Sequence, residues 1–460
     1  MVFSSLEFVF FFLPIAIIGN FLLKRWLPVS NVFLLVISLY FYSWGEPQLV
    51  FLFIGTILVN WLASLFAKER RWIGIVAIVL DISILFMFKY LNWSVDILNA
   101  AFNTGITIKH IALPIGISFY TFQAISYVAD VMSGKVEANR NPISVGLYIA
   151  FFPQLIAGPI VRYTDIEKQL KSRKVTMSSF SDGVVRFLAG FSKKIILADG
   201  MAVIVDKAYD ILSAGELGAA FAWLGAVAYM FQIFLDFSAY SDMAIGLGAM
   251  FGFRIPENFN KPYMAKSIRD FWRRWHISLS IWFRDYVYIP LGGNRNGRTY
   301  FNIAIVWVLT GLWHGASLNF LIWGGVYGIF VMAEKALQID KLLDGKMVLG
   351  WLYRLFTLIC VLFLWVIFRA ENMTVAVQYI KSMFNFGTVN IGRDSPWMYF
   401  WEMKFELLAC AILSFVKLPD KIKENPWYDG GRAIALLIPF LVSVSYLVKG
   451  NFSPFLYFNF

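Results

Sequence analysis

The sequence predicts an all-α protein that crosses a membrane many times, and three observations lead to this prediction. Of the 460 residues, 59% are hydrophobic and 15% are charged, whereas soluble domains carry about 25% charged residues. Aromatic residues make up 18% of the chain, which suits long lipid-facing and interfacial surfaces. No polar stretch is long enough to form a soluble domain. We therefore expect one transmembrane domain over residues 1–460 and exclude a disordered chain, a disulfide scaffold and a cytosolic enzyme.

Thirteen apolar segments are candidates for membrane spans, each of which needs about 20 apolar residues. They are 6–23, 31–44, 49–66, 72–91, 113–129, 144–160, 184–205, 217–236, 300–317, 319–337, 348–368, 405–417 and 433–449. Several are short, or are interrupted by glycine, proline or charge. We therefore expect about eleven transmembrane helices, with the remaining segments re-entrant or interfacial. Basic residues follow segments 6–23 and 49–66, and they predict that the C-terminal ends of these two segments lie in the cytoplasm.

Two of these segments contain helix breakers in apolar surroundings, Leu-Pro-Ile-Gly-Ile-Ser at 113–118 and Phe-Pro-Gln-Leu-Ile-Ala-Gly-Pro-Ile at 152–160. Freed backbone groups at membrane depth persist only when they are buried in protein or line a cavity. Both segments are therefore candidate cavity walls. Asp236, Tyr240 and Asp242 are expected at the end of the 217–236 span, where they either bond within the protein or orient a ligand.

The positive charge is concentrated in two short segments. Residues 261–298 contain eight basic and two acidic side chains, and residues 162–174 contain five basic and two acidic side chains. Short basic connections mark the cytoplasmic side of a membrane protein. Topology and anionic lipid headgroups explain most of these charges, and the others could serve an anionic cytoplasmic ligand such as a nucleotide-containing cofactor.

Residues Ile268 to Tyr286 show the periodicity of an amphipathic helix. Trp272, Trp275 and Trp282 fall on its apolar side. A neighbouring stripe is formed by Arg269, Arg273, His276, Ser280 and Arg284. Such a helix suits the plane of the membrane interface, but a lipid anchor has no need of an imidazole among guanidinium groups. The three arginines are candidate ligands for the anionic end of a bound molecule.

The chain has three histidines, His110, His276 and His314, and no sequence cluster typical of a metal site. We therefore expect no metal. His314 lies near the end of an apolar run, and Gly311 and Gly315 flank it, which would admit a substrate or another backbone. An imidazole is well suited to act as a general base for an alcohol. The alternative is a histidine that is hydrogen-bonded inside a helix bundle.

The sequence resembles the membrane-bound O-acyltransferase (MBOAT) family, and most closely its alginate O-acetylation branch. The matching segments are Phe271-Trp-Arg-Arg-Trp-His-Ile-Ser-Leu-Ser280, Trp282-Phe-Arg-Asp-Tyr286, Ile289-Pro-Leu-Gly-Gly-Asn294, Leu309-Thr-Gly-Leu-Trp-His-Gly-Ala-Ser317, Val2-Phe-Ser-Ser-Leu-Glu-Phe8, Tyr42-Ser-Trp-Gly-Glu-Pro47, Leu113-Pro-Ile-Gly-Ile-Ser-Phe-Tyr-Thr-Phe122 and Phe368-Arg-Ala370. They lie in order within residues 1–385, and 386–460 adds C-terminal helices with little family pattern.

The resemblance implies that His314 is the essential catalytic histidine and His276 its companion. It also implies a ring of helices around a thin centre crossed by a tunnel, in a bacterial inner membrane. Acetyl-CoA would be the donor, and an extracytoplasmic polysaccharide or a partner acetyltransferase would receive the acetyl group. Arg269, Arg273 and Arg284 would hold the donor, and no nucleic acid partner is expected. D-alanyl transfer from a carrier protein to teichoic acid is the alternative within this class, and a transporter or flippase is the alternative outside it.

Overall fold

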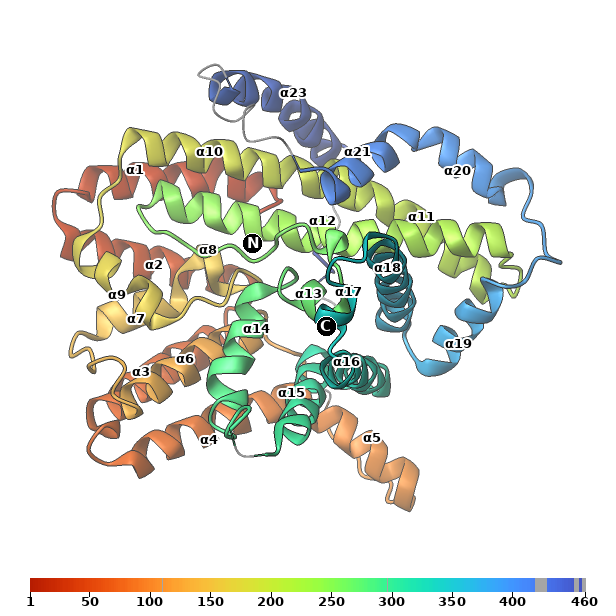
Figure 1. Cartoon of the computed structure of the whole chain (residues 1–460). Coiled ribbons are helices and arrows are strands. Elements are labelled where there is room, and N and C mark those ends of the chain that lie inside the picture. Colours follow the sequence, from red (N-terminus) through yellow and green to blue (C-terminus); the bar gives the residue numbers. More distant parts are fainter. Residues whose placement is uncertain (110, 296, 418–427, 451–454, 457–460) are drawn as a thin grey trace. The chain divides into compact units, whose positions relative to one another are not determined.

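The computed structural model describes residues 1–109, 111–295, 297–417, 428–450 and 455–456, and all its regular elements are helices (Figure 1). The all-α prediction is therefore confirmed. Among the described helices, six are long and apolar enough to cross a membrane. They are Leu27–Gly45, Val50–Ala67, Arg71–Lys89, Ala219–Met250, Met347–Arg369 and Gly430–Val448. The count of about eleven crossings stays a prediction.

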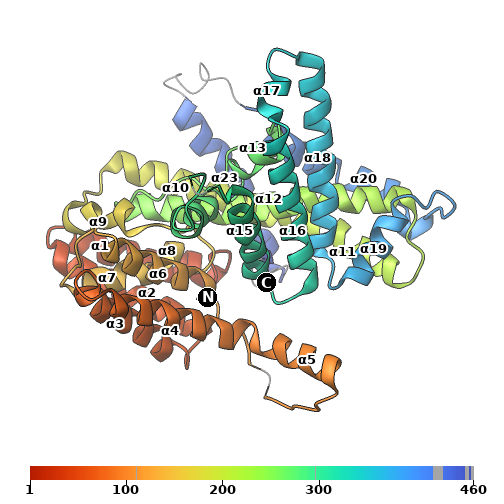
Figure 2. The same ribbon diagram turned by 60° about the horizontal axis from the view of Figure 1, so that its bottom comes forward.

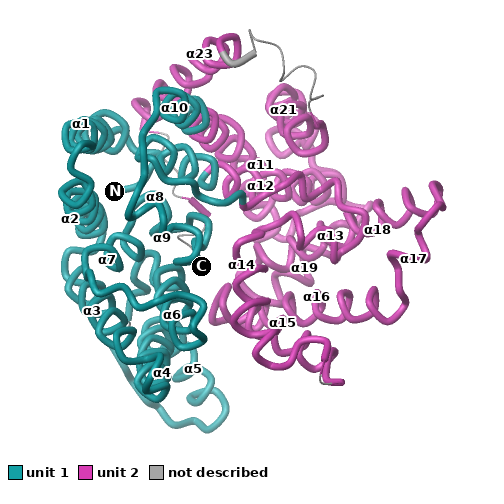
Figure 3. The backbone as a smooth tube through the Cα atoms, turned by 60° about the vertical axis from the view of Figure 1, so that its left-hand side comes forward, with its two compact units in different colours: residues 1–188, 240–257 teal, residues 189–239, 258–460 magenta. Residues whose placement is uncertain are grey.

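The backbone divides into two compact units, which Figure 3 distinguishes by colour. Unit 1 comprises Met1–Leu188 and Tyr240–Glu257, and unit 2 comprises Ala189–Ala239 and Asn258–Phe460. The helix α12 (Ala219–Met250) starts in unit 2 and ends in unit 1. The expectation of one transmembrane domain over residues 1–460 stays a prediction.

Unit 1 is a helical bundle in which α3 and α4 pack against α6, and α2 packs against α7. A π-helical turn at Phe8–Phe12 precedes the first of its α-helices. These are α1 (Leu13–Leu23), α2 (Leu27–Gly45), α3 (Val50–Ala67), α4 (Arg71–Lys89), α5 (Leu91–Phe102), α6 (Ile117–Met132), α7 (Pro142–Ala150), α8 (Phe152–Leu155), α9 (Tyr163–Ser172) and most of α10 (Met177–Ser192).

The interruptions predicted at 113–118 and 152–160 are present in unit 1. Helix α6 starts directly after Gly116, whose φ of 75° lies in the left-handed region. A Cβ at Gly116 would lie 2.7 Å from the carbonyl oxygen of Leu155, so glycine is required for this close approach. Helix α8 is a single turn of four residues. Protein buries both interruptions, and their role as cavity walls stays a prediction.

Unit 2 contains the region that carries both candidate catalytic histidines. Its helices are α11 (Asp199–Ser213), α13 (Ile268–Trp272), α14 (Ile277–Phe283), α15 (Thr299–His314), α16 (Leu318–Ala336), α17 (Ile339–Leu343), α18 (Met347–Arg369), α19 (Met373–Ser382), α20 (Pro396–Glu402), α21 (Lys404–Phe415) and α23 (Tyr428–Val448). The closest packing in this unit is between α15 and α16, which lie side by side.

The segment 184–205, expected as one candidate span, is interrupted. A π-helical turn at Lys193–Ala198 separates α10 from α11. Within this turn, buried Lys194 forms ion pairs with Asp199 at 2.6 Å and with Asp236 at 2.8 Å. Two carboxylates thus neutralise a cation that burial would otherwise make costly.

The polar residues after position 236 lie inside α12, so the expected end of that span was wrong. The helix continues to Met250 because its carboxylates are paired and need no water. Lys194 neutralises Asp236, and Arg186 lies 3.0 Å from Asp242. These contacts favour the structural alternative for both carboxylates.

The prediction of a single amphipathic helix over Ile268–Tyr286 is also wrong. The structure has α13, a turn, α14 and then a π-helical turn at Arg284–Tyr288. The break falls at His276, whose φ of 45° is left-handed. The N–H of Ile277 donates to the carbonyl oxygen of Asn258 at 2.9 Å instead of continuing the helix. Local periodicity carries no information about a partner so distant in the sequence.

The three tryptophans of this segment, expected on the apolar side of an interfacial helix, are buried in the protein. Trp272, Trp275 and Trp282 are 7%, 3% and 6% exposed. The ring of Trp272 packs against Trp307 at 4.8 Å, and that of Trp275 against Trp365 at 4.8 Å. Their partners belong to an aromatic core inside unit 2. Trp272 and Trp275 therefore stabilise the fold, and they do not anchor a surface helix in lipid.

Candidate active site

His314 is the last residue of α15 and is surrounded by aromatic rings. The residue is buried, with 7% of its surface exposed. The imidazole centroid lies 4.8 Å from Trp313, 4.9 Å from Trp323 and 5.1 Å from Phe368. These residues come from α15, α16 and α18. Three helices therefore fix the ring in an environment of low polarity, where electrostatic interactions are stronger than in water.

The glycines beside His314 admit another backbone, which is one of the two possibilities expected for them. A Cβ at Gly311 would lie 2.4 Å from the carbonyl oxygen of Phe320, and one at Gly315 would lie 2.3 Å from the Phe320 ring. Gly324 of α16 faces this contact, because its Cβ would lie 2.5 Å from the carbonyl oxygen of Trp307. Small residues let helix backbones approach in this way. The glycines thus position His314 by close packing.

Asn319 ties the turn after His314 to the end of α18. It is 1% exposed, and its Nδ2 donates to the carbonyl oxygen of Ala370 at 2.6 Å. Ala370 follows the motif residue Phe368 by two positions, so this bond keeps the Phe368 ring close to the imidazole. The chain segments after α15 and after α18 are thereby held together around His314.

His276 lies on the turn between α13 and α14, and Asn258 fixes that turn. The backbone N–H and the hydroxyl of Ser278 both donate to Asn258 Oδ1, at 3.0 Å and 2.9 Å. The N–H of Asn260 donates to the carbonyl oxygen of Arg274 at 2.9 Å. A left-handed non-glycine residue costs about 1–3 kcal/mol and persists where its surroundings over-determine it, as happens at many functional sites.

The two predicted histidines meet around one tryptophan. The Trp313 ring centroid lies 5.8 Å from that of His276 and 4.8 Å from that of His314. Burial lowers the pKa of the His276 imidazole to about 3, so this ring is neutral at physiological pH. A neutral imidazole can donate and accept hydrogen bonds, but it cannot neutralise an anionic ligand.

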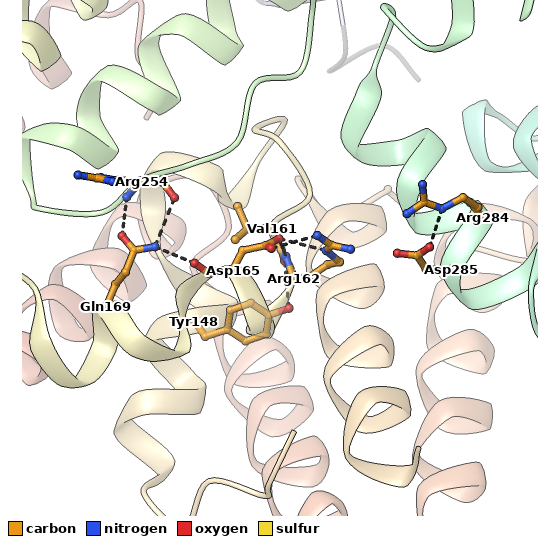
Figure 4. Close-up of polar contacts among 8 residues, drawn as sticks. All are labelled: Tyr148, Val161, Arg162, Asp165, Gln169, Arg254, Arg284 and Asp285. Atoms are coloured by element: carbon orange, nitrogen blue, oxygen red, sulfur yellow. Dashed lines mark hydrogen bonds and ion pairs between the residues drawn. The ribbon is translucent and has the colours of Figure 1, made fainter. Parts of the chain in front are cut away.

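The three candidate arginines line one cavity of about 360 Å³ in unit 2, which we call the arginine cavity. Lys335 adds a fourth cation to its wall. Arg269 pairs with Asp340 at 3.1 Å, and Arg284 pairs with Asp285 at 2.7 Å (Figure 4). In the part of the chain that the structure describes, Arg273 forms no ion pair.

Much of the other lining of the arginine cavity is apolar, and part of it belongs to α15. It includes Trp272, Leu279, Phe283, Ile303 and Trp307, together with the hydroxyl residues Ser280 and Thr310. Thr310 precedes His314 by four residues, which is about one helical turn. The cavity therefore combines cations with an apolar wall one turn away from the candidate base.

The basic segment 162–174 of unit 1 has a different character. Arg162 pairs with Asp165 at 3.0 Å, and the N–H of Arg254 donates to Gln169 Oε1 at 2.7 Å (Figure 4). These charges and amides are used within the unit. No catalytic residue was predicted in this segment, and its contacts serve the fold.

Sequence reasoning missed Glu334, which holds the start of α13. This residue of α16 is 2% exposed. The N–H groups of Ile268 and Arg269 donate to its two carboxylate oxygens at 2.7 Å and 2.9 Å, and the Tyr353 hydroxyl donates at 3.1 Å. A carboxylate at a helix N-terminus satisfies donors that lack helical partners. The available signal was an acid within the apolar run 319–337.

We expect Glu334→Gln to lower the free energy of unfolding by about 1–3 kcal/mol, because an amide supplies only one acceptor to donors that now bond two oxygens. Thermal unfolding in detergent measures this loss. The apparent KM for the acyl donor should rise as well, since Arg269 is displaced. Glu371→Gln, an exposed acid just after α18, is the matched control. Equal stability of the two variants would contradict the anchoring role.

Among the described residues, no group of three His, Cys, Asp or Glu side chains is placed to hold a metal ion. His110 lies outside the described residues.

Comparison with known proteins gives consistent matches over the whole chain. Residues 139–375 match the model of MBOAT, the membrane-bound O-acyltransferase family. The chain is 40% identical to the probable alginate O-acetylase AlgI of Pseudomonas putida, with 100% of both chains covered. It is 33% identical to a peptidoglycan O-acetyltransferase of Helicobacter pylori, over 100% of this chain and 98% of the relative. It is 30% identical to a teichoic acid D-alanyltransferase of Bacillus subtilis, over 47% of this chain and 58% of the relative.

Proposed function

The chain belongs to the membrane-bound O-acyltransferase family, and from this premise we propose that it moves acetyl groups from cytoplasmic acetyl-CoA across the membrane. The acceptor is an extracytoplasmic polysaccharide, reached directly or through a partner acetyltransferase. The two full-length relatives named above are O-acetylating proteins of alginate and of peptidoglycan, which supports acetyl as the acyl group and a polysaccharide as its destination. A bacterial inner membrane is the location that fits both substrates.

The observation that carries this proposal is the position of His314 one helical turn from a cationic cavity. In the proposed reaction, His314 takes the proton of an acceptor hydroxyl as its oxygen attacks the thioester carbonyl. The new C–O bond forms, the C–S bond breaks, and the proton passes from His314 to the leaving thiolate. General base catalysis of this kind contributes about 10²–10⁴-fold to the rate.

His276 has a different role in the proposed mechanism. Because its ring is neutral and contacts Trp313, it orients the residues around His314 or relays a proton through hydrogen bonds. We assign donor binding to the arginines. The phosphate groups of acetyl-CoA pair with guanidinium groups in the arginine cavity, since such charge-assisted bonds are short and strong. A tunnel from this cytoplasmic cavity to His314, as the family resemblance implies, would carry the acetyl end of the donor.

The donor assignment predicts a specific kinetic effect of Arg273→Gln. Arg273 is exposed and forms no ion pair within the described chain, so its replacement leaves no buried acid unpaired. Loss of a charge-assisted bond costs about 1.5–3 kcal/mol, and the KM for acetyl-CoA should rise at least tenfold with kcat little changed. Arg269→Gln and Arg284→Gln should act in the same direction. Initial rates of the purified protein with labelled acetyl-CoA measure these constants.

Arg295→Gln is the matched control, because Arg295 is exposed, belongs to the same basic segment and lines no part of the arginine cavity. An unchanged KM in all three cavity variants would remove the donor assignment. A KM that rises equally in Arg295→Gln would reduce the effect to general electrostatic attraction.

The same assay separates the alternatives. D-alanyl transfer predicts product only with a D-alanyl carrier-protein thioester, and the partial match to a D-alanyltransferase makes this the second candidate. A transporter or flippase predicts no acylated product in detergent with either donor.

A further inference from the structure

A second and larger cavity is lined by residues of α13, α17 and α18 and of the turns beside them. Figure 2 shows α17 between the ends of α16 and α18. It has a volume of about 620 Å³ and is lined by five basic and three acidic side chains. The basic ones are Lys266, Arg273, Arg274, Lys346 and Arg354, and the acidic ones are Asp270, Asp340 and Asp344. We call it the α17 cavity. Arg273 also lines the arginine cavity, whereas Lys346 and Arg354 lie outside the sequence motifs and have no part in the proposed reaction.

Of the five bases that line the α17 cavity, one is paired with an acid of the same cavity. Asp270 pairs with Arg274 at 3.0 Å, and Asp340 pairs with Arg269 at 3.1 Å. In the described part of the chain, the other four cations form no ion pair, and one acid, Asp344, remains to oppose them. Among the described residues, the cavity thus presents an excess of positive charge.

Arg354 lies within a candidate membrane span, where an unpaired charge is costly. It is the eighth residue of α18, a candidate span that starts at Met347, so it lies about 10 Å along the helix axis from that start. It is half-buried, and its guanidinium carbon lies 4.7 Å above the Trp351 ring. A cation inside a spanning helix normally pairs with a partner or extends to the interface. An anion in the α17 cavity would supply that partner.

The rim of the α17 cavity is apolar and aromatic. Met347 is 78% exposed and Trp351 is 63% exposed, and both line the cavity. Their neighbours Val348 and Leu352 on the first turns of α18 are 74% and 59% exposed. Side chains of this kind at the end of a span face lipid, with tryptophan at the level of the headgroups. The site therefore joins a cationic cavity to a lipid-facing surface.

We propose that the α17 cavity binds the phosphate headgroup of an anionic membrane phospholipid. Lys346 and Arg354 pair with the phosphate, and the acyl chains run along the exposed face that Met347 and Trp351 begin. Basic pockets at the cytoplasmic ends of transmembrane helices are suited to such headgroups. A soluble phosphate would satisfy the cations but would leave the apolar rim without a partner, which favours a lipid.

The test is equilibrium binding of fluorescent phosphatidylglycerol to the purified full-length protein in a neutral detergent. We expect saturable binding that excess phosphatidylglycerol displaces and phosphatidylcholine does not. The double variant Lys346→Gln/Arg354→Gln should weaken the affinity at least tenfold. Lys341→Gln, an exposed cation of α17 that does not line the cavity, should bind as the parent does. Lys346→Gln alone, at an exposed position, should give an intermediate loss and covers the case in which the double variant fails to fold.

Three results would overturn the proposal. The first is parental affinity in both Lys346 variants, and the second is an equal loss of affinity in Lys341→Gln. The third is complete displacement of the lipid by free coenzyme A or inorganic phosphate, which would identify the α17 cavity as a site for a soluble phosphate. Acetyl transfer is measured separately, so this proposal and the donor assignment can fail independently.

Discussion

Replacing His314 by glutamine is expected to lower the rate of acyl transfer by about 10²–10⁴-fold, because glutamine cannot accept the proton of the acceptor hydroxyl. The fall should appear in kcat, with the KM for acetyl-CoA nearly unchanged, since the arginines proposed to bind the donor are intact. Glutamine has nearly the volume of histidine, so the ring of aromatic residues around position 314 stays filled. Single-turnover rates with labelled acetyl-CoA measure the effect.

His314→Ala is a less informative variant. The glycines beside His314 admit α16 and do not create open space, so alanine would leave a cavity among Trp313, Trp323 and Phe368 and would destabilise the protein. His276→Gln is the useful comparison. It should reduce activity less than His314→Gln does, because the role proposed for His276 is to orient residues or relay a proton, and not to act as the base. A folded His314→Gln protein with the parental rate would contradict the assignment of the base.

The second large effect is expected at Gly324, where the neighbouring Gly325 provides a matched control on the same helix. A Cβ at Gly324 would lie 2.5 Å from the carbonyl oxygen of Trp307, whereas nothing lies within 4 Å of a Cβ at Gly325. Gly324→Ala must therefore push α15 and α16 apart, with a loss of stability of about 1–3 kcal/mol, as overpacking of cores produces. It should also displace His314 and abolish transfer.

Gly325→Ala should leave activity unchanged and raise the unfolding temperature slightly, because alanine is favoured over glycine in a helix by about 0.5–1 kcal/mol. Unfolding temperature and initial rate of the two variants check both statements. Similar behaviour of the two substitutions would show that the contact between α15 and α16 does not position the histidine.

Much of the fold could be predicted because hydropathy reports directly on burial in lipid or protein. Helices α2, α3, α4, α15, α16 and α18 lie close to the apolar segments predicted for them. The helix breakers around Gly116 were predicted as well, since proline and glycine act locally. The extension of α12 was not predictable, because Lys194 and Arg186 neutralise its carboxylates from another segment.

The candidate site could be predicted in its residues but not in its geometry. The motifs pointed to both histidines, and the predicted helical stripe pointed to the three arginines. The structure places the histidines around Trp313 and the arginines on one cavity. The helical stripe that joined Arg269, His276 and Arg284 does not exist, because Asn258 bonds to the turn at Ile277 and Ser278. Glu334 was missed for the same reason. Its partners at the start of α13 are more than sixty residues distant in the sequence.

The most direct test of the account follows acetyl groups across a membrane. Inside-out vesicles that contain the protein, its acceptor polysaccharide and any partner acetyltransferase are given acetyl-CoA labelled in the acetyl group on their outer, originally cytoplasmic face. We predict that label appears on the enclosed polysaccharide as base-labile ester, at a rate that falls about 10²–10⁴-fold with His314→Gln. Label that reaches the polysaccharide equally with His314→Gln would contradict the account, as would transfer that requires a D-alanyl carrier protein.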